Sequence, residues 1–425
     1  MRRCAVRYDK RVKGFTRALA VAATAALLVP ALGARAGQAL PDGAAPKTVR
    51  FWVPARGGYL ATWREAARRA QQAHPDVQIR VEPMWGDYTA RLTLALAERQ
   101  APDLVVVDPT LAARLASRGW LADVTGVVAS YTPPAAALQA FTWHGRVYAV
   151  PGFLDPVLLY ANAEHLAAAG LEPPSTSWNW DRLLEAGRQL VSSGTSRWAM
   201  GVNGWPPLAM FIWQAGGALL EPPGQPWSGD AAVLEAARYY RRFIDEGLSP
   251  PAPASWQRPP EVLFRTAEAA FMMGLFSDPL EVPGAPSPFR PGEPPVAGGR
   301  AFAVRIAPVP AGPVSRATWA WVEGAAVPEP ATPDALAALE YLAEALHSLG
   351  WRPHVPGRAD AQAAADAALP FARTLPAVPA FLEFDAVFWD HLVVPLVRDG
   401  PVDAATLLQR AWPHLQQILQ RPVSP

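Results

Sequence analysis

The chain has few of the residues and patterns on which much enzyme chemistry depends. Its only cysteine is Cys4, so a disulfide is excluded, and so is a catalytic thiol anywhere after the N-terminal segment. No GxSxG, GxxxxGK[ST] or GxGxxG motif occurs, and the seven histidines show neither HExxH nor HxxxH spacing. We therefore expect no zinc site, no nucleotide-binding loop, no cofactor and no catalytic residue of these types.

Positive charge is also scarce once the N-terminus is set aside. Residues 1–36 hold eight of the 38 Lys and Arg residues and one of the 37 acidic residues, so the remainder has a net charge of −6. That remainder contains no basic patch, which excludes the electrostatic footprint of a nucleic-acid-binding protein.

The first 36 residues have the pattern of an export signal. Seven basic residues lie between Arg2 and Arg17, an apolar run covers Ala18–Leu32, and Ala34-Arg35-Ala36 places small residues where signal peptidase cleaves. The run is shorter than the roughly 20 residues that span a membrane, although an uncleaved anchor is the alternative. Arg2-Arg3 is a poor match to twin-arginine export. We expect a periplasmic or extracellular protein cleaved after Ala36, without a lipid because no cysteine follows that site.

The remaining 389 residues are too many for one ordinary core and suit two lobes. Strand-like runs alternate with helical patterns and predict a parallel sheet flanked by helices. The predicted strands are Val49–Val53, Val77–Val81 and Leu104–Val107, and the predicted helices are 63–73, Tyr88–Arg99 and Pro109–Arg118. Pro279–Gly298 is too rich in proline for a helix or inner strand and is predicted to be a surface loop. Pro413 is expected to kink or break the last helix.

Several segments together resemble a known family. They are APDLVVVDPTLAARLASRGWLADVTG from Ala101, YAVPGFLDPVLLYANAEHLAAAGL from Tyr148, SWNWDRLLEAGRQL at 177–190, EAAFMMGLFSDP at 268–279, the segment 317–346, and VDAATLLQRAWPHLQQIL at 402–419. Their order and spacing resemble the family 1 extracellular solute-binding proteins of bacterial ABC importers, which include the maltodextrin-binding proteins.

The resemblance implies a monomeric, two-lobed α/β fold of the periplasmic-binding-protein type II, with a hinged cleft and no chemistry. The chain would cross between lobes near Pro151–Asp155, Ala303–Val309 and Val355–Asp360. Residues 47–152 and 303–357 would then form lobe 1, and residues 153–302 and 358–425 lobe 2. The implied partners are a small carbohydrate and the membrane permease subunits.

Ligands of open parallel sheets lie beyond the carboxyl ends of the strands, which selects several candidates. Trp and Asp suit a sugar, because a ring face covers the C–H face of a pyranose and a carboxylate accepts from hydroxyls. The candidates are Gly57, Trp85, Asp87, Asp108, Asp155, Trp205, Phe276, Asp278 and Trp319. The resemblance places Asp155 at the hinge, where relatives carry a binding carboxylate, and Phe276 where relatives carry a stacking ring.

Six of these candidates have a purely structural alternative. Gly57 can belong to a plain turn, Asp87 and Asp108 can cap helices, and Asp155 can form a turn before Pro156. Trp85 and Trp319 can be core residues.

Other functions also remain open at this point. A secreted carbohydrate-active hydrolase needs only two carboxylates at a suitable distance, and a sensory subunit would bind solute in the same way. A glycerol phosphodiester or another polyol is the alternative solute. A phosphate would require an arginine in the cleft, for which Arg56 is the loop candidate.

Overall fold

Strands and helices alternate at the start of the chain, as the apolar pattern predicts. In the computed structural model, residues 46–55, 57–218, 230–278, 302–354, 359–374, 378 and 381–419 are described. The export signal, Arg56 and the proline-rich loop lie outside these residues. Among the described residues, no helix is long and apolar enough to cross a membrane.

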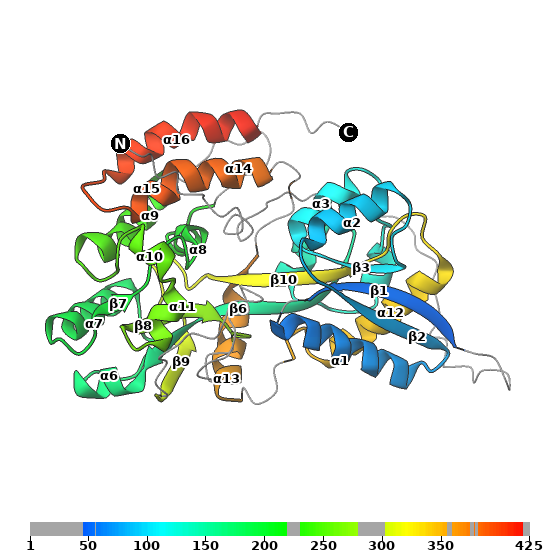
Figure 1. The fold of residues 1–425 in the computed structure, drawn as a ribbon, viewed down its shortest axis with the longest axis horizontal. Helices are drawn as coiled ribbons and strands as arrows, with labels where there is room; N and C mark the ends of the chain where they lie inside the picture. Colours follow the sequence, from blue (N-terminus) through cyan, green and yellow to red (C-terminus); the bar gives the residue numbers. More distant parts are fainter. Residues whose placement is uncertain are drawn as a thin grey trace, which may run out of the picture.

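The described part forms two halves that lie side by side along the long axis of the molecule (Figure 1). The N-terminal half contains β1 (Lys47–Pro54), α1 (Gly57–Ala73), β2 (Val77–Met84), α2 (Tyr88–Ala97), β3 (Leu104–Val107), α3 (Pro109–Ala116), α4 (Thr125–Ala129), α5 (Ala135–Ala140), β4 (Thr142–Trp143), β5 (Arg146–Val147) and α12 (Pro333–Ser348). The C-terminal half contains α6 (Ala163–Ala168), α7 (Trp180–Ser192), β7 (Trp198–Met200), α8 (Leu208–Gln214), α9 (Asp230–Asp245), α10 (Ala254–Gln257), α11 (Pro260–Arg265), β8 (Ala269–Leu275), β9 (Val304–Pro308), α13 (Ala359–Ala368), α14 (Phe381–Phe388), α15 (Val394–Val397) and α16 (Ala404–Leu419).

Two long strands, β6 (Val150–Asn162) and β10 (Thr318–Ala326), run through both halves and join their sheets. The strand order is β2-β1-β3-β10-β6-β8-β7, with β9 on β6 and β11 (Ala372–Arg373) on β10. β1 is parallel to β2 and β3, but β10 is antiparallel to both β3 and β6. The sheet is therefore mixed rather than wholly parallel, because β10 enters the N-terminal half from the opposite direction.

The hydrophobic cores show where each strand crosses. Along β6, Leu154 belongs to the N-terminal core and Val157 to the C-terminal core. Along β10, Trp319 belongs to the C-terminal core and Ala320 to the N-terminal core, and Ala320 is paired with Pro156. Both crossings therefore lie at one level, and the crossing of β6 lies between Leu154 and Val157.

The second crossing lies later in the sequence than the predicted Ala303–Val309. β9 pairs with Leu158–Asn162 of β6, so it belongs to the C-terminal half and the chain crosses at Trp319–Ala320. Residues that directly follow the proline-rich segment thus extend the C-terminal sheet before the chain returns. Most of the third expected crossing, near Val355–Asp360, lies outside the described residues.

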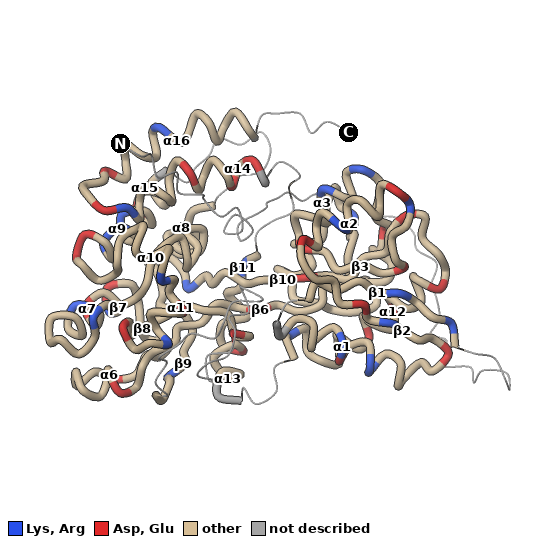
Figure 2. Tube along the Cα trace, in the orientation of Figure 1, with Lys and Arg blue, Asp and Glu red and all other residues tan. Residues whose placement is uncertain are grey.

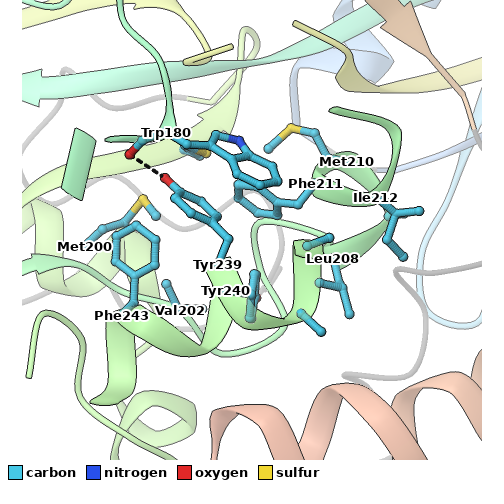
Figure 3. Packing of buried hydrophobic residues seen from close by; sticks show 14 of the residues in the cluster. Trp180, Met200, Val202, Leu208, Met210, Phe211, Ile212, Tyr239, Tyr240 and Phe243 are labelled. Atoms are coloured by element: carbon cyan, nitrogen blue, oxygen red, sulfur yellow. Dashed lines mark hydrogen bonds between the residues drawn. The ribbon is translucent and has the colours of Figure 1, made fainter. Parts of the chain in front are cut away.

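Aromatic rings fill the C-terminal core (Figure 3). Trp180 stacks on Tyr239 with ring centroids 4.1 Å apart, and the Tyr239 hydroxyl donates to the backbone oxygen of Trp180. Phe211 packs against both rings. Since aromatic pairs add stabilisation beyond the area they bury, this cluster holds α7, α8 and α9 together.

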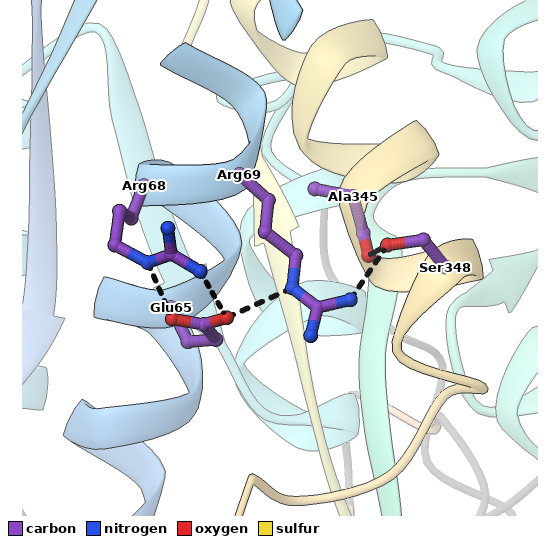
Figure 4. Close-up of polar contacts among 5 residues, drawn as sticks. All are labelled: Glu65, Arg68, Arg69, Ala345 and Ser348. Atoms are coloured by element: carbon purple, nitrogen blue, oxygen red, sulfur yellow. Dashed lines mark hydrogen bonds and ion pairs between the residues drawn. The ribbon is translucent and has the colours of Figure 1, made fainter. Parts of the chain in front are cut away.

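In the N-terminal half, α1 packs against α12, and a polar network borders the contact (Figure 4). The carboxylate of Glu65 accepts from Arg68 and Arg69, and Arg69 also donates to the Ser348 hydroxyl of α12. The two guanidinium groups hold the pKa of Glu65 at about 2.

The last helix does not break at Pro413, contrary to the expectation from its missing N–H. α16 continues through this residue to Leu419. Ala411, Leu415 and Ile418 are buried in the C-terminal core, while Pro413 is exposed. Burial of one face on both sides of the proline offsets the lost hydrogen bond.

Candidate functional site

Asp155 lies where β6 passes from one half to the other, and its side chain is 0% exposed. One carboxylate oxygen accepts from the Tyr59 hydroxyl at 2.9 Å and from the Ser277 hydroxyl at 2.5 Å. The other oxygen accepts from the Ser277 backbone N–H at 3.2 Å. Tyr59 belongs to α1 of the N-terminal half, whereas Ser277 follows β8 of the C-terminal half, so one carboxylate links the two halves.

This geometry differs from the expected solute contact at Asp155. Both oxygens accept from the protein itself, and no part of the side chain is exposed. Burial raises the pKa of Asp155 to about 6, although the hydrogen bonds from Ser277 and Tyr59 oppose the rise. Asp155 is neither a turn residue nor an open binding group here but a buried link within a strand.

Phe276 and Asp278 are also turned inward in this structure. Phe276 packs in a third apolar cluster with Leu158 and Tyr160, so its ring is not available for stacking on a solute. Asp278 accepts from the backbone N–H of Leu275 at 2.8 Å and closes the turn after β8. Burial, with the nearby Asp155 carboxylate, raises the pKa of Asp278 well above its usual range. The predicted solute contacts at these two positions are replaced by turn and core roles.

A row of aromatic rings crosses the hinge beside Asp155. The rings of Tyr59 and Trp321 are stacked, with their centroids 6.5 Å apart. The Trp319 ring lies next in the row, with its centroid 5.8 Å from that of Trp321 and 5.4 Å from that of Trp205, which it meets edge-on. Trp319 is 1% exposed and belongs to the core, the alternative that the sequence left open. Trp205, Trp321 and Tyr59 are each partly exposed. The row therefore presents ring surface from both halves.

Trp205 is held by contacts from distant parts of the chain. Its Nε1 donates to the backbone oxygen of Met273 at 2.6 Å. The preceding Gly204 has φ +102° and lies so close to Trp389 that a Cβ would fall 2.0 Å from that ring. Trp389 begins a π-helical turn, Trp389–Val393, between α14 and α15, a feature frequent at functional sites. Trp389 is partly exposed, and no sequence pattern marks it because π-helical turns have no sequence signature.

In the N-terminal half, the carboxyl ends of the parallel strands lie toward the same region. Val107, the last residue of β3, pairs with Gly324 of β10, which lies nearer the hinge than Ala326 opposite Val105. The carboxyl ends of β1, β2 and β3 therefore face the C-terminal half, since these strands are parallel. This is the edge at which open α/β sheets bind ligands.

The candidates at this edge are mostly helix caps. The Asp87 side chain accepts from the Ala90 N–H and caps α2, and Asp108 accepts from the Thr110 and Leu111 N–H groups and caps α3. Trp85 is 64% exposed and packs in neither core. Gly57 is the first residue of α1 rather than part of a plain turn.

Nothing in the described part of the chain resembles a metal centre. Within residues 46–419 and outside their gaps, no group of three His, Cys, Asp or Glu side chains is arranged to hold a metal ion. The chemistry of the region is that of hydrogen bonding and ring stacking.

Two halves joined by paired strands, with the carboxyl ends of β1, β2 and β3 facing the second half, are typical of hinged two-lobed binding proteins. The chain belongs to the bacterial extracellular solute-binding proteins, whose sequence pattern matches residues 56–346. This confirms the predicted family and fold. Members of this family are receptors without enzymatic activity, which confirms that expectation and removes the hydrolase alternative.

Similar sequences and structures agree with this assignment. An uncharacterized lipoprotein of Streptomyces antibioticus is 28% identical over 182 residues, which cover 40% of this chain and 39% of that protein. A putative binding protein of Brucella abortus is 25% identical over 135 residues, 30% of this chain and 32% of that protein. These matches thus span well under half of either relative.

Solved structures match over a much larger part of the chain. The cyclic α-maltosyl-1,6-maltose binding protein of Arthrobacter globiformis has a TM-score of 0.69 and 19% identity, covering 88% of this chain and all of that one. UgpB of Mycobacterium tuberculosis, in complex with glycerophosphocholine, has a TM-score of 0.67 and 22% identity, and the match covers 89% of this chain and 100% of that one. At these identities the likeness concerns the fold.

Proposed function

We propose that this protein is the solute receptor of an ABC importer and that it captures a sugar or oligosaccharide between its two halves. The signal-like residues 1–36 direct it out of the cytoplasm, and the loaded protein delivers its solute to membrane permease subunits. The cycle consists of capture, closure about β6 and β10, and release.

The aromatic row across the hinge carries the proposal. Sugars present apolar C–H faces and polar hydroxyls, so a site for them combines ring faces with a few hydrogen-bonding groups. Trp205 and Trp321 of this row have partly exposed rings, and Trp389, which lies against Gly204, adds a third. Asp87 and Asp108 lie at the opposite edge with carboxylates that can also accept from hydroxyls. The related structures support the same class, because the Arthrobacter protein is named for a cyclic maltosyl sugar and another neighbour contains laminaribiose.

A binding screen on the exported protein tests the proposal. Its melting temperature would be measured with maltose, longer α-glucans, laminaribiose and tagatose, followed by calorimetry with every compound that shifts it. A solute that binds only the folded form raises the melting temperature, by an amount that grows with its concentration over Kd. Stabilisation by a carbohydrate, with quenching of tryptophan fluorescence, is the expected result. A protein that no carbohydrate in the screen stabilises would contradict the proposal.

Export is tested separately by N-terminal sequencing of the protein from the extracytoplasmic fraction. The proposal expects a soluble chain that begins near Gly37. A membrane-bound product that retains Met1 would show that the N-terminal segment is an anchor instead.

A further inference from the structure

Arg114 lies on the side of the N-terminal half that faces the C-terminal half. It is near the end of α3, the helix that Asp108 starts at the carboxyl end of β3. Helical side chains incline toward the N-terminus of their helix, so this long side chain extends back toward Asp108 and the sheet edge. Glu383 of α14, in the other half, is one of the charged groups that act on it. Figure 2 shows α3 and α14 on facing sides of the two halves.

The guanidinium of Arg114 is half-buried and has no partner in the described part of the chain. Its Nε is buried without an acceptor, and we find no hydrogen bond or ion pair of this group among the residues that the structure describes. Buried Nε atoms without an acceptor also occur in Arg265 and Arg352, but Arg352 pairs with Asp366. Two other enclosed arginines, Arg241 and Arg316, make several hydrogen bonds. Arg241 donates to Asp245 and to backbone oxygens of α15 and the segment after it, and Arg316 donates to three backbone oxygens.

The charges around Arg114 do not compensate for its burial. Burial lowers the pKa of the guanidinium, Asp108 and Glu383 act in the opposite direction, and Arg118 adds to the lowering. One oxygen of Asp108 already accepts two backbone N–H groups at the start of α3. Glu383 is exposed to solvent, where its charge is screened. A cation enclosed in this way is best stabilised by an anionic oxygen that arrives with the solute.

We infer that Arg114 is a specificity residue that receives an anionic group of the solute, a phosphate ester or a carboxylate carried by a sugar or polyol. This inference rests on the proposed function, because it requires the solute to occupy the space between the halves. It narrows the solute from carbohydrates in general to those that bear a negative charge.

The test compares neutral and charged forms of the same compounds. Calorimetry would measure glucose against glucose 6-phosphate and glucuronate, and glycerol against glycerol 3-phosphate and a glycerol phosphodiester. The variants are Arg114→Gln and, as the matched control, Arg118→Gln, which removes the same charge from an exposed position beside α3. Glu383→Gln is the third variant, because it distinguishes a solute contact from an ion pair between the halves.

We expect the charged compounds to bind the parent protein more tightly than their neutral forms. Arg114→Gln should weaken the charged compounds at least tenfold, since a charge-assisted hydrogen bond is lost, and leave neutral binding within about twofold. Arg118→Gln should weaken charged binding far less than Arg114→Gln does and leave neutral binding unchanged, because the Arg118 charge acts on this position only through space. Glu383→Gln should leave charged binding unchanged or tighter. The melting temperature of solute-free Arg114→Gln should be equal or higher, because an unpaired half-buried charge is removed.

Comparison of the phosphorylated compounds with glucuronate shows whether Arg114 binds a phosphate or a carboxylate. If the neutral forms bind as tightly as the charged ones, or if Arg114→Gln weakens both alike, the inference is wrong while the proposed function stands. A parallel loss of all binding in Glu383→Gln and Arg114→Gln would instead show that these residues pair across the hinge. If no compound in either screen binds, the proposed function fails and the inference fails with it.

Discussion

The two halves contribute different chemistry to the region between them. The N-terminal half contributes charged side chains. Asp87 and Asp108 cap the helices that start after β2 and β3, and Arg114 lies on the second of these helices. The C-terminal half contributes rings, Trp205 and Trp389, that lie on an irregular loop and a π-helical turn. One side is thus suited to polar groups of a solute and the other to its apolar faces.

This difference reflects how each side is held in place. A helix cap needs only its own first turn, so Asp108 is positioned by residues within three places of it. Trp205 depends on Met273 and Trp319, and Trp389 depends on close approach to Gly204. Substitutions on the aromatic side should therefore affect folding and binding together, while those on the polar side should separate the two.

The largest effect is expected for Trp205→Ala. Loss of the ring removes its contact with Trp319 and its hydrogen bond to Met273. We expect the free energy of unfolding to fall by about 2–4 kcal/mol, somewhat below the cost for a fully buried tryptophan. Solute binding should weaken by about tenfold or more, because a stacking face is also lost. Urea unfolding and calorimetry measure the two effects.

Trp85→Ala is the matched control on the N-terminal side. Its ring is 64% exposed and packs in neither core, so stability should change by less than about 0.5 kcal/mol. A loss of binding in this variant at unchanged stability would show that closure brings Trp85 onto the solute. Unchanged binding in Trp205→Ala would remove the aromatic side from the site.

Much of the fold could be predicted from local patterns. The apolar runs at Val49–Val53 and Leu104–Val107 predicted strands within one or a few residues of their observed bounds, and Asp108-Pro109 predicted a helix start that is present. The second crossing was misplaced because β9 and β10 are both plausible apolar strands. Only their pairing with β6 shows to which half each belongs.

The site was harder to predict, since exposure depends on tertiary packing. Asp155 was found as a hinge residue, but its partners Tyr59 and Ser277 are 96 and 122 residues away. The inward turn of Phe276 and Asp278 depends on the third apolar cluster and on a tight turn after β8. Arg114 was missed because a helical arginine has no pattern that distinguishes an unpaired side chain from a solvated one.

Asp155→Asn tests the link between the two sides and should remove a pH dependence of stability. Its folded-state pKa of about 6 exceeds the ordinary 3.8. The folded protein therefore gains stability from the protonated form below about pH 4 and loses it as the pH rises through 6. Two pKa units correspond to about 3 kcal/mol, so the free energy of unfolding of the parent should decline by up to that amount relative to the variant between pH 4 and 7.

Chemical unfolding of both proteins across this pH range measures the difference. The control is Asp87→Asn, which makes the same side-chain change at an exposed carboxylate. The Asp155 charge also contributes to the raised pKa of Asp278, so Asp155→Asn should lessen that rise, and the difference between the curves reports the two carboxylates together. Parallel curves for Asp155→Asn and the parent would mean that this carboxylate is not desolvated.

Asp108 allows capping and solute binding to be separated on the polar side. Asp108→Ala removes the acceptor for the Thr110 and Leu111 N–H groups and should lower the free energy of unfolding by about 1 kcal/mol. Asp108→Ser keeps a capping oxygen and should cost less than about 0.5 kcal/mol. If Asp108 also contacts the solute, both variants lose affinity despite their different stabilities. Equal affinity of Asp108→Ser and the parent would leave Asp108 with the cap alone.

The smallest effect on binding is expected for Glu65→Gln, which lies in the α1–α12 network and in neither side of the site. Its ion pairs with Arg68 and Arg69 are partly exposed, so the loss of stability at neutral pH should stay below about 1 kcal/mol and shrink as salt is added. Because the Glu65 pKa is lowered to about 2, this contribution is present above its ordinary 4.5 and is lost as the pH falls toward 2. The variant and parent should therefore unfold alike at low pH and bind solute equally at pH 7. A loss of affinity in this variant would mean that the outer face of the N-terminal half takes part in closure.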